Sequence, residues 1–140
     1  MEILNPNDVA TESLVFLNPE ILLVVIDLFP FTLEQVRIDV SKRIIQLASL
    51  HQENLSSLSR VGIIRFIQER LHETLKNPED PLQPVLLTLI EIISAHRLSP
   101  VELRNHFQLL NEAKPASHLL KSLLSMVRVL ASSAAATVIP

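Results

Sequence analysis

The residues best suited to chemistry are the histidines, and His72 followed by Glu73 is the first pair to consider. A zinc-protease helix needs a second histidine four positions after the first, so that both rings reach one metal ion from the same face. That position is Lys76, and we therefore interpret the pair as polar residues on a solvated helix face. The other histidines are each ten or more positions from the next: His51, His96, His106 and His118. The spacing predicts no metal site.

The sequence likewise contains no motif that indicates nucleophilic or acid–base catalysis. The chain has one glycine and no cysteine, which excludes Gly-x-Ser-x-Gly elbows, Gly-rich phosphate loops, disulfides and cysteine nucleophiles. The carboxylates Glu69 and Glu73 lie one helical turn apart, but Arg65 and Lys76 flank them as in a surface ion-pair ladder. The sequence therefore predicts that the protein is not an enzyme and needs no cofactor.

A small basic spot is the one surface for which we expect a ligand. Arg97 and Arg104, with His96 and His106, surround the turn between two predicted helices. An anionic peptide or a lipid headgroup could dock there, although so few charges also suit a solvated loop. Arg97, Arg104 and His106 are accordingly the candidate partner-binding residues.

The overall charge points away from nucleic acid. Twelve basic residues stand against fifteen acidic ones, for a formal charge of −3, whereas proteins that bind the phosphate backbone carry a basic footprint. Arg60, Arg65 and Arg70 lie five positions apart, a step that turns about 140° around a helix and forms no single basic stripe. We expect protein partners and no nucleic acid.

Composition indicates one all-helical domain. Apolar residues make up 48% of the 140 positions, and a single glycine argues against folds rich in tight β-hairpins. The most apolar run, residues 21–26, lies between two acids and is far shorter than the roughly 20 residues of a membrane span. Glu2 stands where a secretory signal would carry positive charge. We expect a cytoplasmic protein, with peripheral association with endomembranes left open.

Proline and small polar residues mark the predicted helix ends. Four helices begin at such signals: Asn18-Pro19, Thr32 with Gln35, Asp80-Pro81, and Ser99-Pro100 with Glu102. Thr32 with Gln35 and Ser99 with Glu102 have the spacing of capping boxes. The four helices run over about 19–29, 32–50, 81–96 and 99–111. Three more are predicted over about 8–17, 60–76 and 117–133, with residues 51–59 as a loop containing one short turn.

Apolar stripes with helical spacing run along these segments. In the helix over 32–50 the stripe is Leu33, Val36, Val40, Ile44 and Leu47. The helix over 81–96 is apolar nearly all round, which is typical of a helix between neighbours on more than one side. The last helix has its own strong stripe: Leu119, Leu120, Leu123, Leu124, Val127 and Leu130. With no later helix to cover this stripe, we interpret residues 117–133 as the end of a truncated array.

The spacing of the helix pairs favours a repeat architecture. Two helix pairs begin near Leu33 and Leu82, and the unpaired last helix begins near Ser117. The mean separation of these starts falls in the range of roughly 40–47 residues for armadillo and HEAT units. The predicted fold is therefore all-α, with antiparallel helix hairpins in an armadillo/HEAT-like α-solenoid fragment of about seven helices. Residues 1–31 would form N-terminal helices leading into the array, and residues 32–140 the repeat segment. A closed helical bundle is the alternative.

Leucine-rich stretches of the chain also resemble a known family. Residues 71–82, 86–93 and 120–127, LHETLKNPEDPL, LLTLIEII and LKSLLSMV, are similar to armadillo-type segments that precede the BEACH domain in giant BEACH–WD40 scaffold proteins. The BEACH core, the WD blades and the FYVE cysteines of that family are absent. The resemblance, over about residues 32–133, implies a fragment of a very large cytosolic scaffold in vesicle trafficking, lysosome-related organelles or autophagy. It carries over no functional residue.

The leading hypothesis is thus a non-enzymatic helical scaffold segment that binds protein partners and the rest of its parent chain. The alternative is a self-contained helical bundle that serves as a regulatory or oligomerisation domain. An enzyme is the third hypothesis, and it would require a concave pocket with converging His, Glu or Arg side chains.

Overall fold

The computed structural model describes residues 15–113 and 117–138. These residues form eight α-helices and one short 3-10 helix, and no strand occurs among them. The elements are α2 (Glu20–Asp27), the 3-10 helix η1 (Phe29–Phe31), α3 (Glu34–Leu50), α4 (Gln52–Arg60), α5 (Ile63–Arg70), α6 (His72–Lys76), α7 (Leu82–His96), α8 (Pro100–Glu112) and α9 (Ser117–Val138). The all-α prediction is confirmed. The helix expected over 8–17 lies outside the described residues up to residue 14, and residues 15–17 are not helical.

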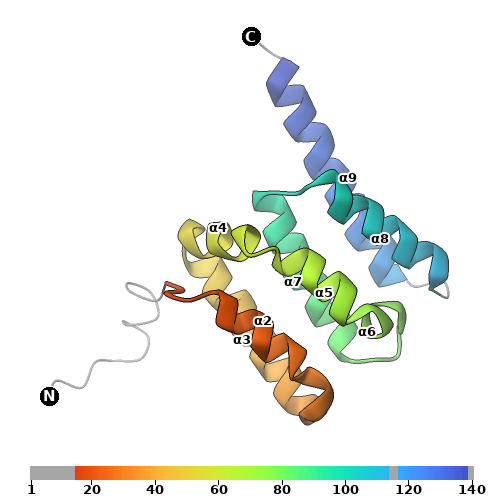
Figure 1. Ribbon diagram of the computed structural model, residues 1–140. Coiled ribbons are helices and arrows are strands. Elements are labelled where there is room, and N and C mark those ends of the chain that lie inside the picture. The colour runs from red at the N-terminus through yellow and green to blue at the C-terminus, as the bar shows by residue number, and fades with distance from the viewer. Residues whose placement is uncertain (1–14, 114–116, 139–140) are drawn as a thin grey trace, which may run out of the picture.

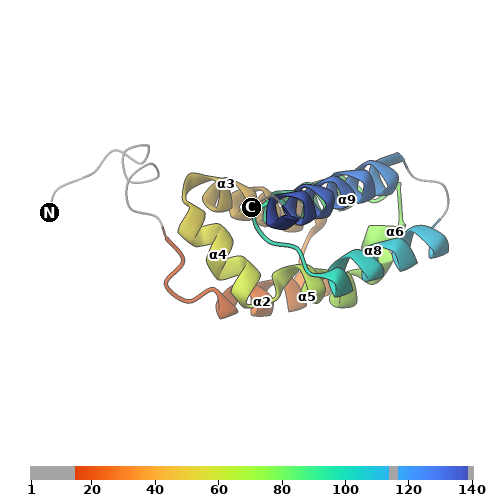
Figure 2. The same ribbon diagram turned by 90° about the horizontal axis from the view of Figure 1, so that it is seen from above.

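The helices pack in two layers. Helices α3, α7 and α9 lie side by side in one layer, and α2, α5 and α8 in the other (Figure 2). The chain alternates between the layers, so that the pairs α2/α3, α5/α7 and α8/α9 follow one another, with the middle pair between the other two (Figure 1). Helix α4 packs against α3 and α7, and α6 against α7 and α8. Stacking of successive pairs in one direction is the arrangement of an α-solenoid.

Helix α7 lies at the centre of this stack, as its apolar sequence predicts. It contacts α3 and α9 in its own layer, and also α4, α5 and α6. Its buried apolar side chains are Leu82, Leu86, Leu87, Leu89, Ile90 and Ile93. Because such a helix has neighbours on several sides, an apolar surface nearly all round it is stable.

Helix α4 replaces the loop predicted over residues 51–59, and that prediction is wrong. Leu58 is fully buried. The buried amide of Asn54 donates a 2.7 Å hydrogen bond to the carbonyl of Leu47 and accepts a 2.9 Å bond from the amide of Phe16. The four-residue spacing of Asn54 and Leu58 turns one face of the segment inward. Tertiary packing of that face outweighs the low helix propensity of its serines and asparagine.

The single helix predicted over 60–76 is interrupted twice. Gly62 adopts φ +72° and ψ +38° between α4 and α5, a left-handed conformation that glycine adopts without the steric penalty of a side chain. Leu71 adopts φ −112° and ψ 30° between α5 and α6. The result is two short helices, α5 and α6, and a turn at Gly62 that faces the segment after α7.

The two capping boxes differ in outcome. The Ser99 hydroxyl accepts a 3.3 Å hydrogen bond from the amide of Glu102, so the cap of α8 is confirmed. The box at Thr32 is wrong, because the Thr32 hydroxyl donates instead to the carbonyl of Phe29 in the preceding 3-10 turn. Leu33 is the N-cap residue of α3 and makes no side-chain cap bond.

The stripe predicted along α3 holds only in its second half. Ile44 is buried, but Leu33 is 76% exposed and Val36 44% exposed. The buried face of α3 is instead centred on Ser41, Ile44 and Ala48, whose spacing of three and four is helical. Val36, five positions before Ser41, lies about 140° from it around the helix.

Candidate functional site

The three predicted partner-binding residues do not share a surface. Arg97 and Arg104 are exposed, but His106 is fully buried. On a helix, residues 104 and 106 lie about 200° apart, so Arg104 faces solvent while His106 faces inward at the junction of α8 and α9. The assignment of His106 to a binding surface is wrong.

Burial also removes the charge that this assignment required. Burial lowers the pKa of His106 from 6.5 to about 4, and the backbone of Leu119 opposes part of this shift. Neither ring nitrogen makes a hydrogen bond of ordinary geometry to a described residue. His106 is therefore neutral at pH 7 and cannot attract an anion.

Arg97 instead lines a cleft between the α4–α5 turn and the segment that joins α7 to α8. We call this cleft the arginine pocket. Its volume is about 470 Å³, and three arginines from separate segments line it: Arg60 at the end of α4, Arg65 in the first turn of α5, and Arg97 after α7. All three are exposed, and none forms an ion pair or hydrogen bond with a residue that the structure describes. The fold thus brings three arginines from separate segments to the lining of one cleft.

Two carboxylates share the arginine pocket. Glu69 and Glu102 both line it. Burial raises the pKa of Glu102, while the hydrogen bond to Ser99 and the nearby charges of Arg65 and Arg97 oppose the shift. The Oε2 atom of Glu102 is buried and has no hydrogen-bond partner among the described residues. The lining therefore offers both donors and acceptors.

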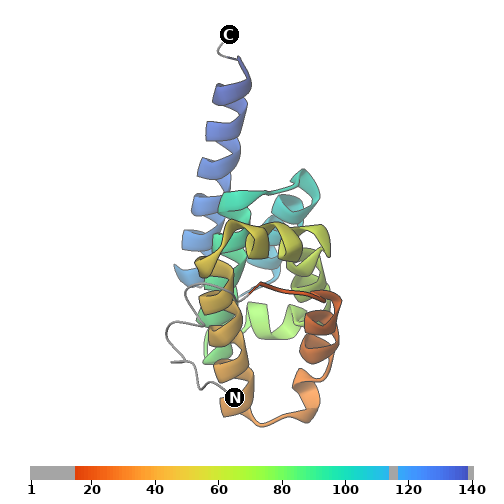
Figure 3. The same ribbon diagram turned by 90° about the vertical axis from the view of Figure 1, so that its left-hand side faces the viewer.

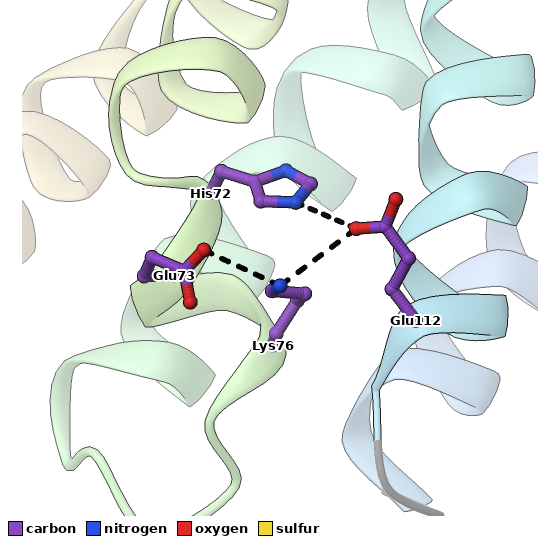
Figure 4. Close-up of polar contacts among 4 residues, drawn as sticks. All are labelled: His72, Glu73, Lys76 and Glu112. Carbon is purple, nitrogen blue, oxygen red and sulfur yellow. Dashed lines mark hydrogen bonds and ion pairs between the residues drawn. The ribbon is translucent and has the colours of Figure 1, made fainter.

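A second polar cluster joins α6 to α8 (Figure 4). The Nε2 atom of His72 lies 2.7 Å from Oε2 of Glu112, and the Lys76 Nζ lies 3.8 Å from the same oxygen. Lys76 also pairs with Glu73 at 3.3 Å. His72 thus contacts Glu112, 40 positions away, and not the adjacent Glu73. The cluster is an ion-pair link between helices, and spacing alone could not have found it.

A serine–histidine contact joins α4 to the end of α7. The Ser56 hydroxyl lies 3.0 Å from Nε2 of His96. A nucleophilic serine needs a base that is itself oriented by a third group, and within the described ranges no carboxylate hydrogen-bonds His96. We therefore interpret the contact as a hydrogen bond that links α4 to α7.

The last helix carries an uncovered apolar row, which we call the α9 row: Leu120, Leu124, Val127 and Ala131. These residues are exposed, whereas Leu119, Leu123 and Met126 on the adjoining face are buried. The stripe predicted for residues 117–133 is thus divided between a covered and an uncovered part. Helix α9 continues to Val138, and its C-terminal portion projects beyond the other helices (Figures 1 and 3).

The opposite end of the stack is also apolar at its surface. Large exposed apolar side chains gather on α2, η1 and the start of α3: Ile21, Val24, Leu28, Phe31, Leu33 and Val36. The two ends of the stack therefore both present large apolar side chains to solvent, whereas no such exposed side chain lies on α5 or α7.

Two classes of site are not found in the described part of the chain. No group of three or more His, Asp or Glu side chains there is placed to hold a metal ion. None of the described helices combines the length and apolar character needed to cross a membrane.

No protein-family model matches the chain, and no solved structure matches it.

Proposed function

We propose that this chain is a non-enzymatic scaffold segment that binds a protein partner through the α9 row. The observation that supports this proposal is the exposure of three large apolar side chains on one helix: Leu120 at 48%, Leu124 at 56% and Val127 at 40%. With Ala131 they are spaced by four, three and four positions, which is the repeat of a helix-packing seam. A contiguous apolar surface of this kind typically marks an interaction site.

The chemistry of α9 favours one kind of partner, an amphipathic helix with acidic flanks. Lys121 and Arg128 are exposed residues of α9, seven positions apart, and no acidic residue occurs between Ser117 and Val138. Leucines on the partner would bury the row, and carboxylates beside them would pair with the two cations.

The cellular role rests on the family resemblance alone. The resemblance of residues 71–82, 86–93 and 120–127 supports a cytoplasmic role in vesicle trafficking, lysosomal or autophagy-related processes as part of a BEACH–WD40-like scaffold. In such a role the stacked helices present surfaces and carry out no reaction. The partner would then be a protein of the same assembly.

A designed peptide tests the role of the α9 row. The probe is a fluorescent helical peptide with leucines at heptad positions and glutamates on both flanks, followed by fluorescence anisotropy. We expect binding to the wild-type protein and a loss of about tenfold or more in the Leu124→Glu variant, because the substitution places a charge in the apolar seam. A matched control, Phe107→Glu, changes an exposed apolar residue of α8 and should leave binding unchanged.

The same proteins distinguish scaffold from oligomerisation domain. Light scattering on the free chain should show a monomer, and a hydrophobic dye should bind to the wild type more than to Leu124→Glu. A stable dimer that Leu124→Glu dissociates would instead support the alternative function, an oligomerisation domain. A monomer with negligible dye and peptide binding would contradict both functions.

A further inference from the structure

We propose that the arginine pocket binds a short, extended acidic segment of a protein partner. This site is separate from the α9 row, and the proposal does not depend on the function assigned to that row. The ligand class is a peptide with one carboxylate side chain directed at the arginines and its backbone along the α7–α8 segment.

The convergence of the three arginines indicates an anionic ligand. Arg60, Arg65 and Arg97 come from three different segments, so only the fold brings them to one cleft. None is neutralised by an ion pair with a described residue. A guanidinium group presents a planar fork of donors that matches a carboxylate with two parallel hydrogen bonds. A cleft of about 470 Å³ lies within the roughly 300–1,000 Å³ of known ligand sites.

The carboxylates of the pocket favour a peptide over a phosphate group. Glu69 and Glu102 line the same cleft as the arginines. They would repel a doubly charged phosphate, which has acceptors only, whereas they can accept hydrogen bonds from the backbone N–H groups of a peptide.

The rest of the lining suits an extended chain with an apolar side chain. Arg97 and Ser99 both have extended backbone conformations, with φ/ψ of −158°/131° and −96°/152°. Phe66 and Val61 add apolar surface to the cleft. Arg70 lies over the Phe66 ring, with its guanidinium carbon 5.2 Å from the ring centroid. A leucine next to the acidic residue of the ligand could therefore contact Phe66.

Gly62 provides a direct readout of occupancy. It lines the arginine pocket and is the only glycine of the chain, so that protein prepared with isotope-labelled glycine gives one amide signal by NMR. The probe is an acetylated, amidated peptide of sequence Ser-Glu-Leu-Glu-Ser, and its matched control is Ser-Gln-Leu-Gln-Ser. We expect the Gly62 signal to shift progressively with the glutamate peptide and not with the glutamine peptide.

Substitutions of single residues test whether the glutamate peptide binds in the arginine pocket. Arg65→Ala and Arg97→Ala should each lower the affinity for the glutamate peptide by about tenfold or more, because each removes charge-assisted hydrogen bonds. Arg104→Ala, an exposed arginine of α8 that does not line the pocket, should bind like the wild type. Leu124→Glu should also bind like the wild type, so that failure of the α9 proposal and failure of this one are distinguishable.

Three outcomes would overturn the proposal. The first is a Gly62 signal that does not move with the glutamate peptide, and the second is equal movement with both peptides. The third is movement with inorganic phosphate or inositol hexakisphosphate alone, which would make the cleft a phosphate site.

Discussion

The side-chain amide of Gln68 donates a 2.9 Å hydrogen bond to the backbone carbonyl of Glu102, which joins α5 to α8 across 34 positions of the chain. The Oε1 atom of Gln68 accepts a further bond of 3.2 Å from Nδ2 of Asn105. Gln68 is only 3% exposed, so water has little access to this amide. Because Glu102 lines the arginine pocket, the Gln68 amide also holds one wall of the pocket in place.

Removal of this amide should destabilise the protein. We expect Gln68→Ala to lower the free energy of unfolding by about 1–3 kcal/mol, because the carbonyl of Glu102 and the amide of Asn105 lose their partner. Urea denaturation measures the change. Gln108→Ala, at an exposed position of α8, is the control and should change stability by less than about 0.5 kcal/mol. Equal stability of Gln68→Ala and wild type would show that the bond contributes nothing.

Stability should fall as the pH is lowered through the range set by His106. The unfolded chain, with a histidine pKa near 6.5, takes up a proton as the pH falls below that value, whereas the folded chain does so only near pH 4. The unfolded state therefore binds more protons between these two pH values. The free energy of unfolding falls by about 3 kcal/mol as the pH is lowered across this range. Glu102 and Glu91, whose pKa values are raised by burial, contribute in the opposite sense.

A His106→Leu variant isolates the contribution of this residue. Its unfolding free energy should lose less on going from pH 7 to pH 4 than that of the wild type, because no buried imidazole remains to resist protonation. His118→Leu, at an exposed position, should keep the slope of the wild type. If His106→Leu and wild type lose the same free energy over this range, His106 is not the group that titrates.

The loss of stability on substituting Gly62 should come from backbone conformation alone. Nothing lies within 4 Å of the position that a Cβ atom would occupy, so Gly62→Ala introduces no clash. It does place a side chain at φ +72°, which costs about 1–2 kcal/mol. Gly62→Asn should lose less, since asparagine adopts the left-handed region more readily. Thermal unfolding of both variants tests this order, and the reverse order would contradict it.

The central position of α7 predicts that an alanine substitution there lowers the free energy of unfolding much more than one in the α9 row. Ile90 is fully buried in the central helix, whereas Leu124 in the α9 row is 56% exposed. We expect Ile90→Ala to lower the unfolding free energy by about 2–5 kcal/mol through lost burial and the cavity that remains. Leu124→Ala should lose less than about 1 kcal/mol, because most of its side chain already contacts water. Similar losses in urea denaturation would mean that the α9 row is covered in solution.

The amino-acid sequence by itself determined the all-helical class and many helix boundaries of this protein. The Ser99 hydroxyl caps α8, and Oδ1 of Asp80 accepts a 2.9 Å bond from the amide of Leu82 at the start of α7. Both interactions span two or three positions, so the residues that make them are neighbours in the unfolded chain as well. The nearly continuous apolar surface of α7 likewise predicted its central place.

Only the tertiary structure decided which residues meet. Arg65 and Arg97 share a pocket although 32 positions separate them, and His106 is buried although Arg104, two positions before it, is exposed. Local periodicity cannot specify such outcomes, because they depend on which helix faces pack together. The same packing turned the polar segment around Asn54 into α4 and left the α9 row without a cover within the described residues. Burial of apolar surface between helices far apart in the chain is the physical cause, since it favours an arrangement of the whole stack over the preference of any single segment.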